Sequence, residues 1–231
     1  LTGDFVLDKN LDTPLYNYTV VIDDALMEIS HVMRGEDHIS NTPKQILIYQ
    51  ALGFAIPLFA HFPLILNPDK TKLSKRKNPV SVSDYLNKGY LKESLINFLA
   101  LLGCNLGTTQ EIFELNELIN TFSIETINKS GAVFDMERLN WVNSEHLRSL
   151  SPEEFTEKAV PYLVKDELIK AEKETSYKIN ETGEIISFQD LVKIVFLEQK
   201  RIKILSEISQ NLKFIFSDNR KYDKSLLLGK D

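Results

Sequence analysis

The chain is arranged around one stretch, Asn67-Pro-Asp-Lys-Thr-Lys-Leu-Ser-Lys-Arg-Lys77. Its Pro-Asp pair predicts a turn, so we expect a loop at this place. Five of its eleven residues are basic, and the hydroxyl side chains of Thr71 and Ser74 lie among them. Such donors suit a phosphate group whose negative charge grows and moves during a reaction. A short basic run is more often a solvated loop, a nucleic-acid patch or a localisation signal, so the rest of the chain has to decide.

Composition limits the kind of protein. The length of 231 residues suits one or two domains, because a domain has about 100–200 residues. Hydrophobic residues make up 43% of the chain and charged residues 26%, which is typical of a chain that buries a core. The net charge of −6 argues against a general nucleic-acid-binding protein, but it is compatible with a local basic patch.

Cysteine and histidine usage points to a reducing compartment without a metal centre. One cysteine, Cys104, excludes an internal disulfide framework, so we expect a cytoplasmic protein. That cysteine and the four histidines lack metal-ligand spacing, so no metal site is expected in this chain. No apolar run is long enough for a membrane span and no leader is recognisable, so no membrane partner is expected. The chain starts without a methionine, and we expect a fragment.

The segment before the basic loop is expected to be α/β. Short apolar or β-branched runs predict strands over residues 4–7, 15–22, 29–33 and 62–66. Between the last two, Asn41 or Thr42 can cap a helix, Pro43 suits its first turn and Gly53 suits its end. Polar turns follow the strands, and ligands of α/β folds bind beyond the carboxyl ends of strands. The pattern predicts half of a doubly wound sheet.

After the loop the apolar pattern becomes helical. It predicts helices over residues 83–88, 92–102, 115–122 and 136–147. Asp135 is the expected cap of the last one, and Trp141 is expected to be in the core. Ser151-Pro-Glu-Glu154 predicts a capping box and a further helix. Residues 165–183 are charged and poorly periodic, which predicts a loop or frayed helix, and Ser187 should cap one long helix from Phe188 to about Ile208.

Five motifs follow one another in an order that is known from one family. They are Tyr16 with Val21-Ile-Asp-Asp24, His31-Val-Met-Arg-Gly-Glu-Asp-His38, Asn41-Thr-Pro-Lys-Gln45, Pro68-Asp-Lys-Thr-Lys-Leu-Ser-Lys-Arg76 and Val133-Phe-Asp-Met-Glu-Arg-Leu-Asn-Trp141. Together, over residues 13–150, they resemble bacterial-type glutamyl-tRNA synthetase, a class I aminoacyl-tRNA synthetase. The pentapeptide 72–76 is similar to that family's KMSKS element, in a KLSKR form.

The resemblance implies a fold that is mixed α/β and then mostly α. Residues 1–69 would be the C-terminal half of a Rossmann-type catalytic domain. Residues 70–150 would hold the KMSKS loop and a helical stem-contact region, and residues 151–231 the start of a helical anticodon-binding region. The family's His-x-Gly-His motif and its inserted acceptor-end domain are absent from this sequence. We therefore expect that the N-terminal part is missing and that the chain alone is inactive.

The implied activity is ATP-dependent ligation of glutamate to tRNA(Glu) through a glutamyl-adenylate. ATP would be a substrate, together with Mg²⁺, and glutamate and tRNA(Glu) would be the other partners of a protein expected to be monomeric. Lys72, Ser74 and Lys75 would be catalytic, with Lys75 the most important. Asp37, Ile65, Lys72 and Lys75 would bind ATP, Ile65 through its backbone. Positioning and charge stabilisation suffice for this chemistry, without a protein nucleophile.

Tyr16 and Arg34 match the positions that hold glutamate in the family. A guanidinium fork binds a carboxylate in bidentate fashion, and a phenol adds one directed hydrogen bond. Without the resemblance, Tyr16 would more simply be a half-buried packing residue of a strand. Arg34 would be paired at the surface with Glu36 and Asp37.

Three other functions are compatible with parts of this pattern. The paralogue that glutamylates queuosine in tRNA ends soon after the region of Trp141, so the helical tail argues against it. Glutaminyl-tRNA synthetase has a β-barrel anticodon region, whereas residues 188–208 predict a helix. A non-catalytic tRNA-binding or scaffold protein fits the missing His-x-Gly-His motif but has no need for Lys72, Lys75, Tyr16 or Arg34. Whether only tRNA(Glu) or also tRNA(Gln) is charged is left open.

Overall fold

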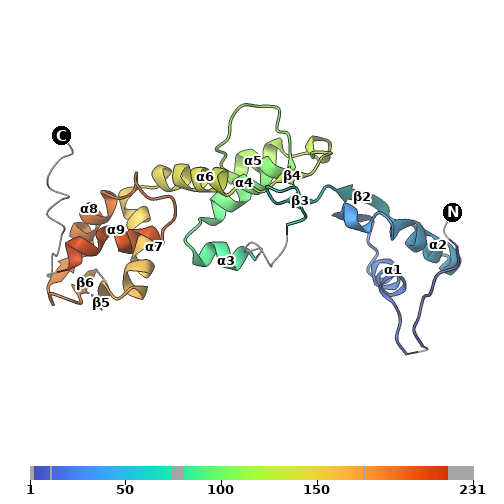
Figure 1. The fold of residues 1–231 in the computed structure, drawn as a ribbon, viewed down its shortest axis with the longest axis horizontal. Helices are drawn as coiled ribbons and strands as arrows, with labels where there is room; N and C mark the ends of the chain where they lie inside the picture. The colour runs from blue at the N-terminus through green and yellow to red at the C-terminus, as the bar shows by residue number, and fades with distance from the viewer. Residues whose placement is uncertain (1–2, 11, 74–80, 174, 218–231) are drawn as a thin grey trace. The chain divides into compact units, whose positions relative to one another are not determined.

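The computed structural model describes residues 3–10, 12–73, 81–173 and 175–217. The chain divides into two compact units, each made of several stretches. Figure 1 shows the helices and strands of the described residues, coloured from blue at the N-terminus to red at the C-terminus. The N-terminal unit comprises Leu1–Leu73, Leu102–Leu106 and Ser123–Phe134, and the C-terminal unit comprises Ser74–Leu101, Gly107–Phe122 and Asp135–Asp231. The described elements mix helices with short strands, so the mixed α/β class is confirmed. None of the described helices is long and apolar enough to cross a membrane.

The N-terminal unit combines helices with short parallel strands. Its elements are α1 (Tyr16–Leu26), β1 (His31–Gly35), the short helix η1 (Glu36–His38), α2 (Thr42–Leu52), β2 (Leu58–Phe62), β3 (Ile65–Leu66), the short helix η2 (Ile124–Thr126) and β4 (Ala132–Val133). β1 pairs with β2, and β3 pairs with β4, both in parallel. Since β1, α2 and β2 follow one another, they form a βαβ unit. The carboxyl ends of β1 and β2 are consequently neighbours, with Gly35 opposite Phe62.

Two predicted strands of this unit are wrong. Residues 4–7 contain no strand, and residues 15–22 lie mostly in helix α1. Aromatic and β-branched residues suggested strands because such side chains fit a pleated surface. In the folded unit Val21 is completely buried, and it belongs to one cluster with Ile48 and Tyr49 of α2. Packing between two helices therefore overrides a weak local preference.

The other predictions for this unit are closer to the structure. The expected helix is confirmed as α2, which has proline in its first turn and ends at the left-handed Gly53, with φ of 70°. The strands expected over residues 29–33 and 62–66 are formed in part, as β1 and β3. Strand β2 was missed, because the polar His61 interrupts its apolar sequence.

The C-terminal unit is mainly helical. Its elements are α3 (Val82–Asn87), most of α4 (Lys92–Gly103), α5 (Leu115–Thr121), α6 (Met136–Ser149), α7 (Pro152–Lys165), β5 (Ile169–Lys173), β6 (Ser176–Ile179), β7 (Ile185–Ser187), α8 (Phe188–Phe196) and α9 (Glu207–Phe216). The helices predicted between residues 83 and 147 are confirmed to within a few residues. So are the Asp135 cap of α6 and the Ser151 capping box of α7.

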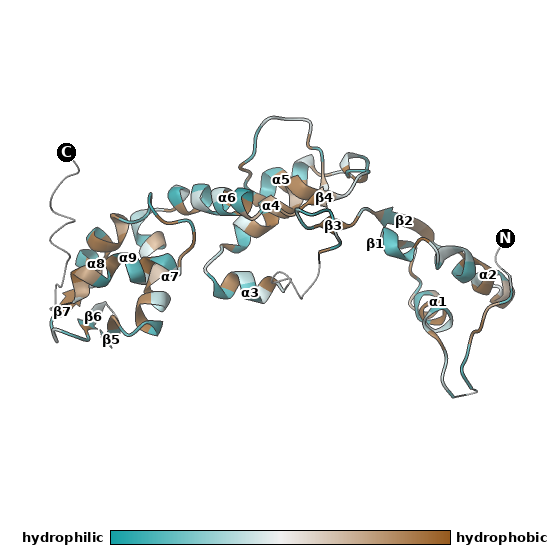
Figure 2. Cartoon of the chain, in the orientation of Figure 1, coloured by the Kyte–Doolittle hydropathy of each residue, from teal (hydrophilic) through white to brown (hydrophobic). Residues whose placement is uncertain are grey.

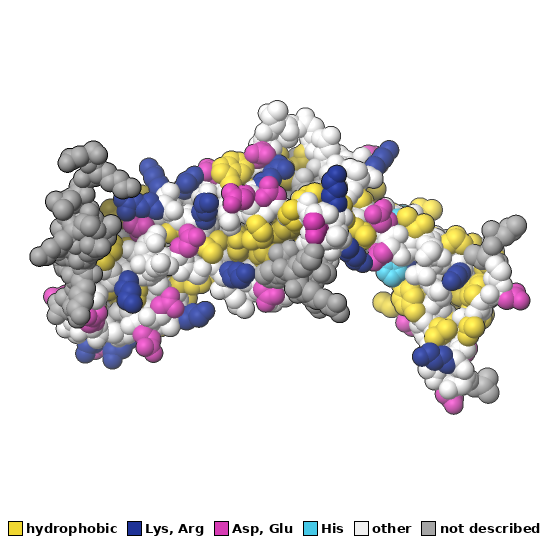
Figure 3. Space-filling view, in the orientation of Figure 1, with side chains coloured by type: hydrophobic (Ala, Val, Ile, Leu, Met, Phe, Trp, Pro, Cys, Tyr) yellow, Lys and Arg dark blue, Asp and Glu magenta, His cyan; other side chains and the backbone are white. Residues whose placement is uncertain are grey.

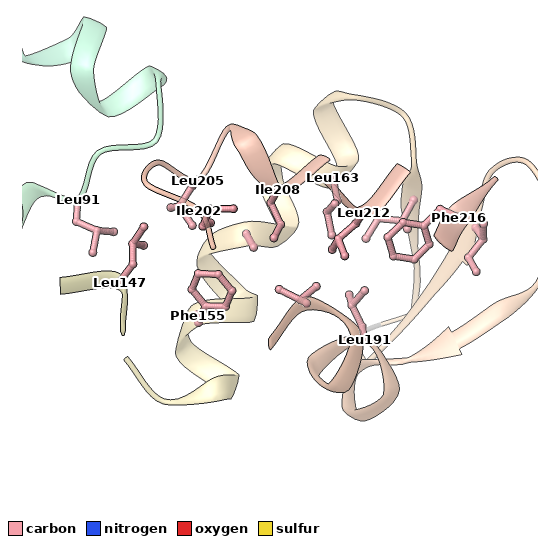
Figure 4. Close-up of a cluster of buried hydrophobic side chains, with 14 residues drawn as sticks. Leu91, Leu147, Phe155, Leu163, Leu191, Ile202, Leu205, Ile208, Leu212 and Phe216 are labelled. Atoms are coloured by element: carbon pink, nitrogen blue, oxygen red, sulfur yellow. The ribbon is translucent and has the colours of Figure 1, made fainter. Parts of the chain in front are cut away.

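Fourteen buried hydrophobic residues form one cluster in this unit. Figure 4 shows Phe155 and Leu163 of α7, Leu191 of α8, and Leu212 and Phe216 of α9 pointing into a shared interior. The hydropathy colours agree, because the brown sides of these helices face one another (Figure 2). Burying the thirteen large aliphatic and aromatic side chains of this cluster, all its members except Ala159, supplies most of the driving force for folding this unit.

A close backbone contact joins two distant parts of the C-terminal unit. Gly89, which follows α3, has a φ of 94°, and a Cβ there would lie 2.7 Å from the backbone nitrogen of Leu205. That nitrogen donates a hydrogen bond to the Gly89 carbonyl at 3.1 Å. The buried Asn143 of α6 accepts from the Leu91 N–H at 2.8 Å and donates to the Lys203 carbonyl at 2.6 Å. A side chain at position 89 would separate these segments.

Three predictions for the C-terminal unit are wrong. Residues 165–183 contain strands β5 and β6, which form an antiparallel sheet with β7 in the order β5-β6-β7. Residues 188–208 form a helix only as far as Phe196, and the chain turns before α9 begins at Glu207. Trp141, expected in the core, is 40% exposed. The first part of 188–208 is nevertheless helical and not a strand, as the comparison with glutaminyl-tRNA synthetase required.

Candidate active site

Polar side chains gather at the carboxyl ends of β1 and β2. Arg34 is the penultimate residue of β1 and lies opposite His61 of β2 in the parallel register. Directly after β1, the short helix η1 carries Asp37 and His38. Placement beyond the carboxyl ends of parallel strands is where α/β folds bind ligands, so this edge is the candidate site.

Arg34 is held by three neutral side chains. Its Nη2 donates to Thr42 Oγ1 at 2.8 Å and to Gln45 Oε1 at 2.7 Å. Its Nε lies 3.5 Å from His61 Nε2, at the limit of a hydrogen bond. In addition, the guanidinium carbon lies 5.4 Å from the centre of the Phe59 ring, a distance typical of a cation–π contact. The orientation of the guanidinium is thereby fixed.

The expected pairing of Arg34 with Glu36 and Asp37 is not formed in the described part of the chain. The guanidinium of Arg34 was expected to bind a ligand carboxylate through two of its nitrogens, but fewer nitrogens are available. Nε and both N–H groups of Nη2 face protein acceptors, so Nη1 is the nitrogen left for a ligand. Among the described residues, no hydrogen bond to Nη1 is formed.

His61 completes the support of Arg34. Its Nε2 is 2.9 Å from the Thr42 hydroxyl. Burial lowers the pKa of His61, and the positive charge of Arg34 lowers it further. The single lone pair of an unprotonated Nε2 can accept the hydrogen bond of the Thr42 hydroxyl at 2.9 Å, and the Arg34 Nε–H makes only a longer contact with it at 3.5 Å. The ring is also stacked beside Phe59, with the ring planes 5° apart.

Tyr16 stands at the first residue of α1 with half of its side chain exposed, at 49%. It is therefore not the strand packing residue of the alternative reading. Its hydroxyl is 3.5 Å from His38 Nδ1, and the two rings are 5.7 Å apart between centroids. The phenol is thus accessible to a ligand, and His38, to which no role was given, is its neighbour.

Asp24 and Tyr49 are two titratable residues whose pKa values are affected by the charge of Arg34. Burial raises the pKa of Asp24, and the charge of Arg34 partly offsets this rise. The pKa of Tyr49 is raised as well, by burial and by the Asp24 charge. Among the described residues, the Tyr49 hydroxyl is buried without a partner within 3.5 Å, and Asp24 and Arg34 are the charged groups that act on it.

The start of the basic loop is folded back on β3. Lys72 forms an antiparallel bridge with Leu66, and the Leu73 N–H donates to the Ile65 carbonyl at 3.0 Å. The buried Asn67 closes the turn by donating to Thr71 Oγ1 at 3.0 Å and to the Lys72 carbonyl at 3.1 Å. The predicted loop is confirmed for this part of the stretch.

Lys72 and Asp37 are brought together by this turn. Lys72 Nζ lies 2.6 Å from Asp37 Oδ2, and both side chains remain partly exposed. The hydrogen bond from Lys72 holds the pKa of Asp37 below its usual range. Two residues that were assigned to the same nucleotide site, 35 positions apart, are therefore neighbours. Ser74 and Lys75 lie outside the described residues, and the role of the Ile65 backbone stays a prediction.

Sequence reasoning missed the supporting residues Asn17, Thr42, Gln45 and His61. Gln45 had one recognisable signal, since it is a polar residue on the side of α2 that carries Ile48 and Tyr49. No three His, Cys, Asp or Glu side chains gather as metal ligands in the described ranges.

Comparison with known proteins places this arrangement in a family. A family model described as "tRNA synthetases class I (E and Q), catalytic domain" matches residues 2–141. The chain therefore belongs to the class I tRNA synthetases of the E and Q type, as the motifs predicted.

Within this class, the similar proteins are glutamate–tRNA ligases. One from Caldicellulosiruptor saccharolyticus is 46% identical over 222 residues, which cover 96% of this chain and 44% of the relative. One from Natranaerobius thermophilus is 44% identical over 218 residues, covering 94% and 42%. A crystal structure of a glutamate tRNA ligase from Elizabethkingia meningosepticum, in complex with its amino acid, matches with a TM-score of 0.79 and 30% identity, covering 97% of this chain and 45% of that one. The chain thus spans a little under half the length of these relatives.

Proposed function

We propose that the protein carrying this chain ligates glutamate to tRNA(Glu) through a glutamyl-adenylate. The observation that carries the proposal is Arg34, a guanidinium at the end of β1 that is held by neutral side chains and, among the described residues, keeps one nitrogen free. A fixed cation with one free nitrogen suits a carboxylate ligand. The names of the similar proteins support glutamate as that ligand.

In the first step, a glutamate α-carboxylate oxygen attacks the α-phosphorus of ATP, and the bond to the bridging oxygen breaks as pyrophosphate leaves. In the second, a ribose hydroxyl of the tRNA terminus attacks the activated carbonyl, and AMP leaves. Lys72, Ser74 and Lys75 would stabilise the departing phosphates. Asp37 and the Ile65 backbone would contribute to the ATP site, and Tyr16 and Arg34 would hold glutamate.

The ion pair between Lys72 and Asp37 would be the state of the site before ATP binds. Before ATP binds, the ammonium of Lys72 is neutralised by a carboxylate 2.6 Å away. ATP phosphates would compete with Asp37 for this ammonium, and an exposed ion pair is weak enough to exchange partners. Mg²⁺ is commonly held by substrate phosphates together with one or two carboxylates. It would enter with ATP, and Asp37, the carboxylate paired with Lys72, could contribute an oxygen ligand to it.

The finer domain assignment is part of the same proposal. Residues 1–69 would be half of a Rossmann-type catalytic domain, residues 70–150 the KMSKS and stem-contact region, and residues 151–231 the start of the anticodon-binding region. The sheet β5-β6-β7 lies in this last region, which is thus less purely helical than expected. The protein would act as a cytoplasmic monomer.

The test is formation of glutamyl-tRNA by the complete gene product with radiolabelled glutamate, ATP and tRNA. Arg34→Ala should lower kcat/KM for glutamate about a hundredfold or more, because a charge-assisted contact is lost from a partly buried site. The KM for ATP should change little. Arg201→Ala is the matched control, since it removes an arginine that is paired with Glu198 in the other unit. A wild-type protein that forms no glutamyl-tRNA would refute the proposal.

A further inference from the structure

The charge of Arg34 is not compensated by a bonded carboxylate in the described part of the chain. Its three hydrogen-bonding partners are a hydroxyl, an amide oxygen and a neutral imidazole nitrogen. Asp24 interacts with Arg34 only through space. A cation in a partly desolvated site attracts an anion far more strongly than a neutral group of the same shape. The charge of the side chains that bind Arg34 therefore affects how strongly the site prefers a charged ligand to a neutral one.

Gln45 is the most buried of the three, with 2% of its surface exposed. Its Oε1 accepts from Arg34 at 2.7 Å, and its Nε2 donates to Asn17 Oδ1 at 3.0 Å. Because both ends of the amide are bonded, it cannot rotate without placing an N–H against the guanidinium. A buried polar group is costly unless its bonds are complete. This amide is therefore fixed with its oxygen toward Arg34.

The free nitrogen Nη1 follows from the same arrangement. Thr42 and Gln45 occupy both N–H groups of Nη2, which leaves Nη1 to meet a ligand. Gln45 therefore affects two properties of Arg34. It orients the guanidinium so that Nη1 is free, and, because it is uncharged, it leaves the positive charge of the guanidinium uncompensated.

We propose that Gln45 is a positioning residue: its amide oxygen directs Nη1 of Arg34 toward the ligand, and its lack of charge preserves the preference of this site for a carboxylate over a carboxamide. The inference rests on the proposed function, in which the ligand of Arg34 is the amino acid glutamate. A neutral amide at position 45 leaves Arg34 with its full charge, which a carboxylate can neutralise and a carboxamide cannot. A carboxylate at position 45 would satisfy the guanidinium internally and remove this difference.

The experiment compares binding of glutamate and glutamine to the complete gene product by calorimetry. In Gln45→Glu, glutamate affinity should fall about tenfold to a hundredfold, because an internal ion pair replaces the ligand contact. The affinity for glutamine should change much less, so the ratio of the two constants collapses. Gln45→Met is the control, since it removes the hydrogen bond and adds no charge. It should weaken both ligands by similar factors and keep the preference for glutamate.

A second variant covers the case in which Gln45→Glu does not fold, as judged by circular dichroism. Thr42→Asp brings a carboxylate to the same nitrogen from the first residue of α2, where a negative charge favours the helix. Thr42→Asn is its uncharged match. A wild-type ratio of glutamate to glutamine affinity in the folded charged variant would overturn the inference, and so would a wild type without this preference. If the wild type prefers glutamate but forms no glutamyl-tRNA, the proposed function fails and the inference stands.

Discussion

The two units differ in what holds them together. In the C-terminal unit, one cluster of fourteen buried hydrophobic residues connects α7, α8, α9 and the small sheet. In the N-terminal unit, the cluster between α1 and α2 has three buried members, Val21, Ile48 and Tyr49. Many of its large apolar side chains are exposed, and Figure 3 shows hydrophobic patches on its surface. This unit also contains the hydrogen bonds from Arg34 to Thr42 and Gln45.

The contacts that stabilise the C-terminal unit are thus of a different kind from those that orient the candidate site in the N-terminal unit. Apolar burial is non-directional and scales with area, so it stabilises a fold without fixing one polar atom. A polar network does the reverse, since each bond fixes a direction and contributes only about 1 kcal/mol. The unit that carries the candidate site should thus be the one that opens more readily. Four predictions test this difference.

The largest effect is expected from Phe155→Ala. The ring is completely buried in the C-terminal cluster, and such a truncation costs about 3–5 kcal/mol of unfolding free energy. Hydrogen exchange followed by mass spectrometry should show faster exchange in peptides of α7, α8 and α9. Equal acceleration in peptides of α1 and α2 would contradict the separation of the two units.

Gly89→Ala should come next. The residue would be strained at a φ of 94°, and its Cβ would meet backbone atoms of Leu205 and Ser206 below 3 Å. We expect a loss of about 1–3 kcal/mol from the left-handed conformation alone, and more from the clash. Urea unfolding measures it, and Gly107→Ala is the control, since it also has positive φ but open space around its Cβ. Equal losses in the two variants would show that the close contact contributes nothing.

Val21→Ala tests the small core of the N-terminal unit. Two methyl groups are removed from a fully buried side chain, which costs about 1.6 kcal/mol by burial alone. The loss should be smaller than for Phe155→Ala, but it should open α1 and α2 selectively in hydrogen exchange. A change as large as that of Phe155→Ala would mean that the N-terminal unit is the better packed one.

The smallest effect concerns the exposed pair of Lys72 and Asp37. Lys72 holds the pKa of Asp37 below its ordinary value of 3.8, so the pair persists at neutral pH and is lost as pH falls through the lowered pKa. In Lys72→Met the Asp37 titration followed by NMR should move up toward the ordinary value. Because the pair is exposed, the urea midpoint at pH 7 should not change. An unchanged Asp37 titration would show that the two groups are apart in solution.

Elements with local signals could be predicted from the sequence. Helix α7 was predictable because Ser151 and Glu154 cap each other within one turn, and α2 because Pro43 and Gly53 delimit it. Helix α1 was not, because only the contact of Val21 with α2 selects a helix. The sheet β5-β6-β7 was hidden although its strands pair with their neighbours in the chain, because four of the five residues of β5 are exposed and three of those are charged, which leaves little alternation of apolar and polar residues.

The candidate site divides in the same way. Tyr16 and Arg34 were found through motifs, which record residue type and order. Gln45 and His61 were not assigned to the site, because their contact with Arg34, 11 and 27 positions away, is made only in the fold. Hydrogen-bond partners at such distances leave no periodic signal in a sequence.

The parallel register of β1 and β2 places Arg34 opposite His61. Because side chains alternate between the two faces of a strand, a slip of one residue would turn His61 away from Arg34 and bring Ala60 or Phe62 opposite it. Under the proposed function, the orientation of the guanidinium that would bind glutamate therefore depends on strand pairing. An insertion or deletion of one residue within β2 should then change ligand specificity, even though neither Tyr16 nor Arg34, the residues proposed to hold glutamate, lies in β2.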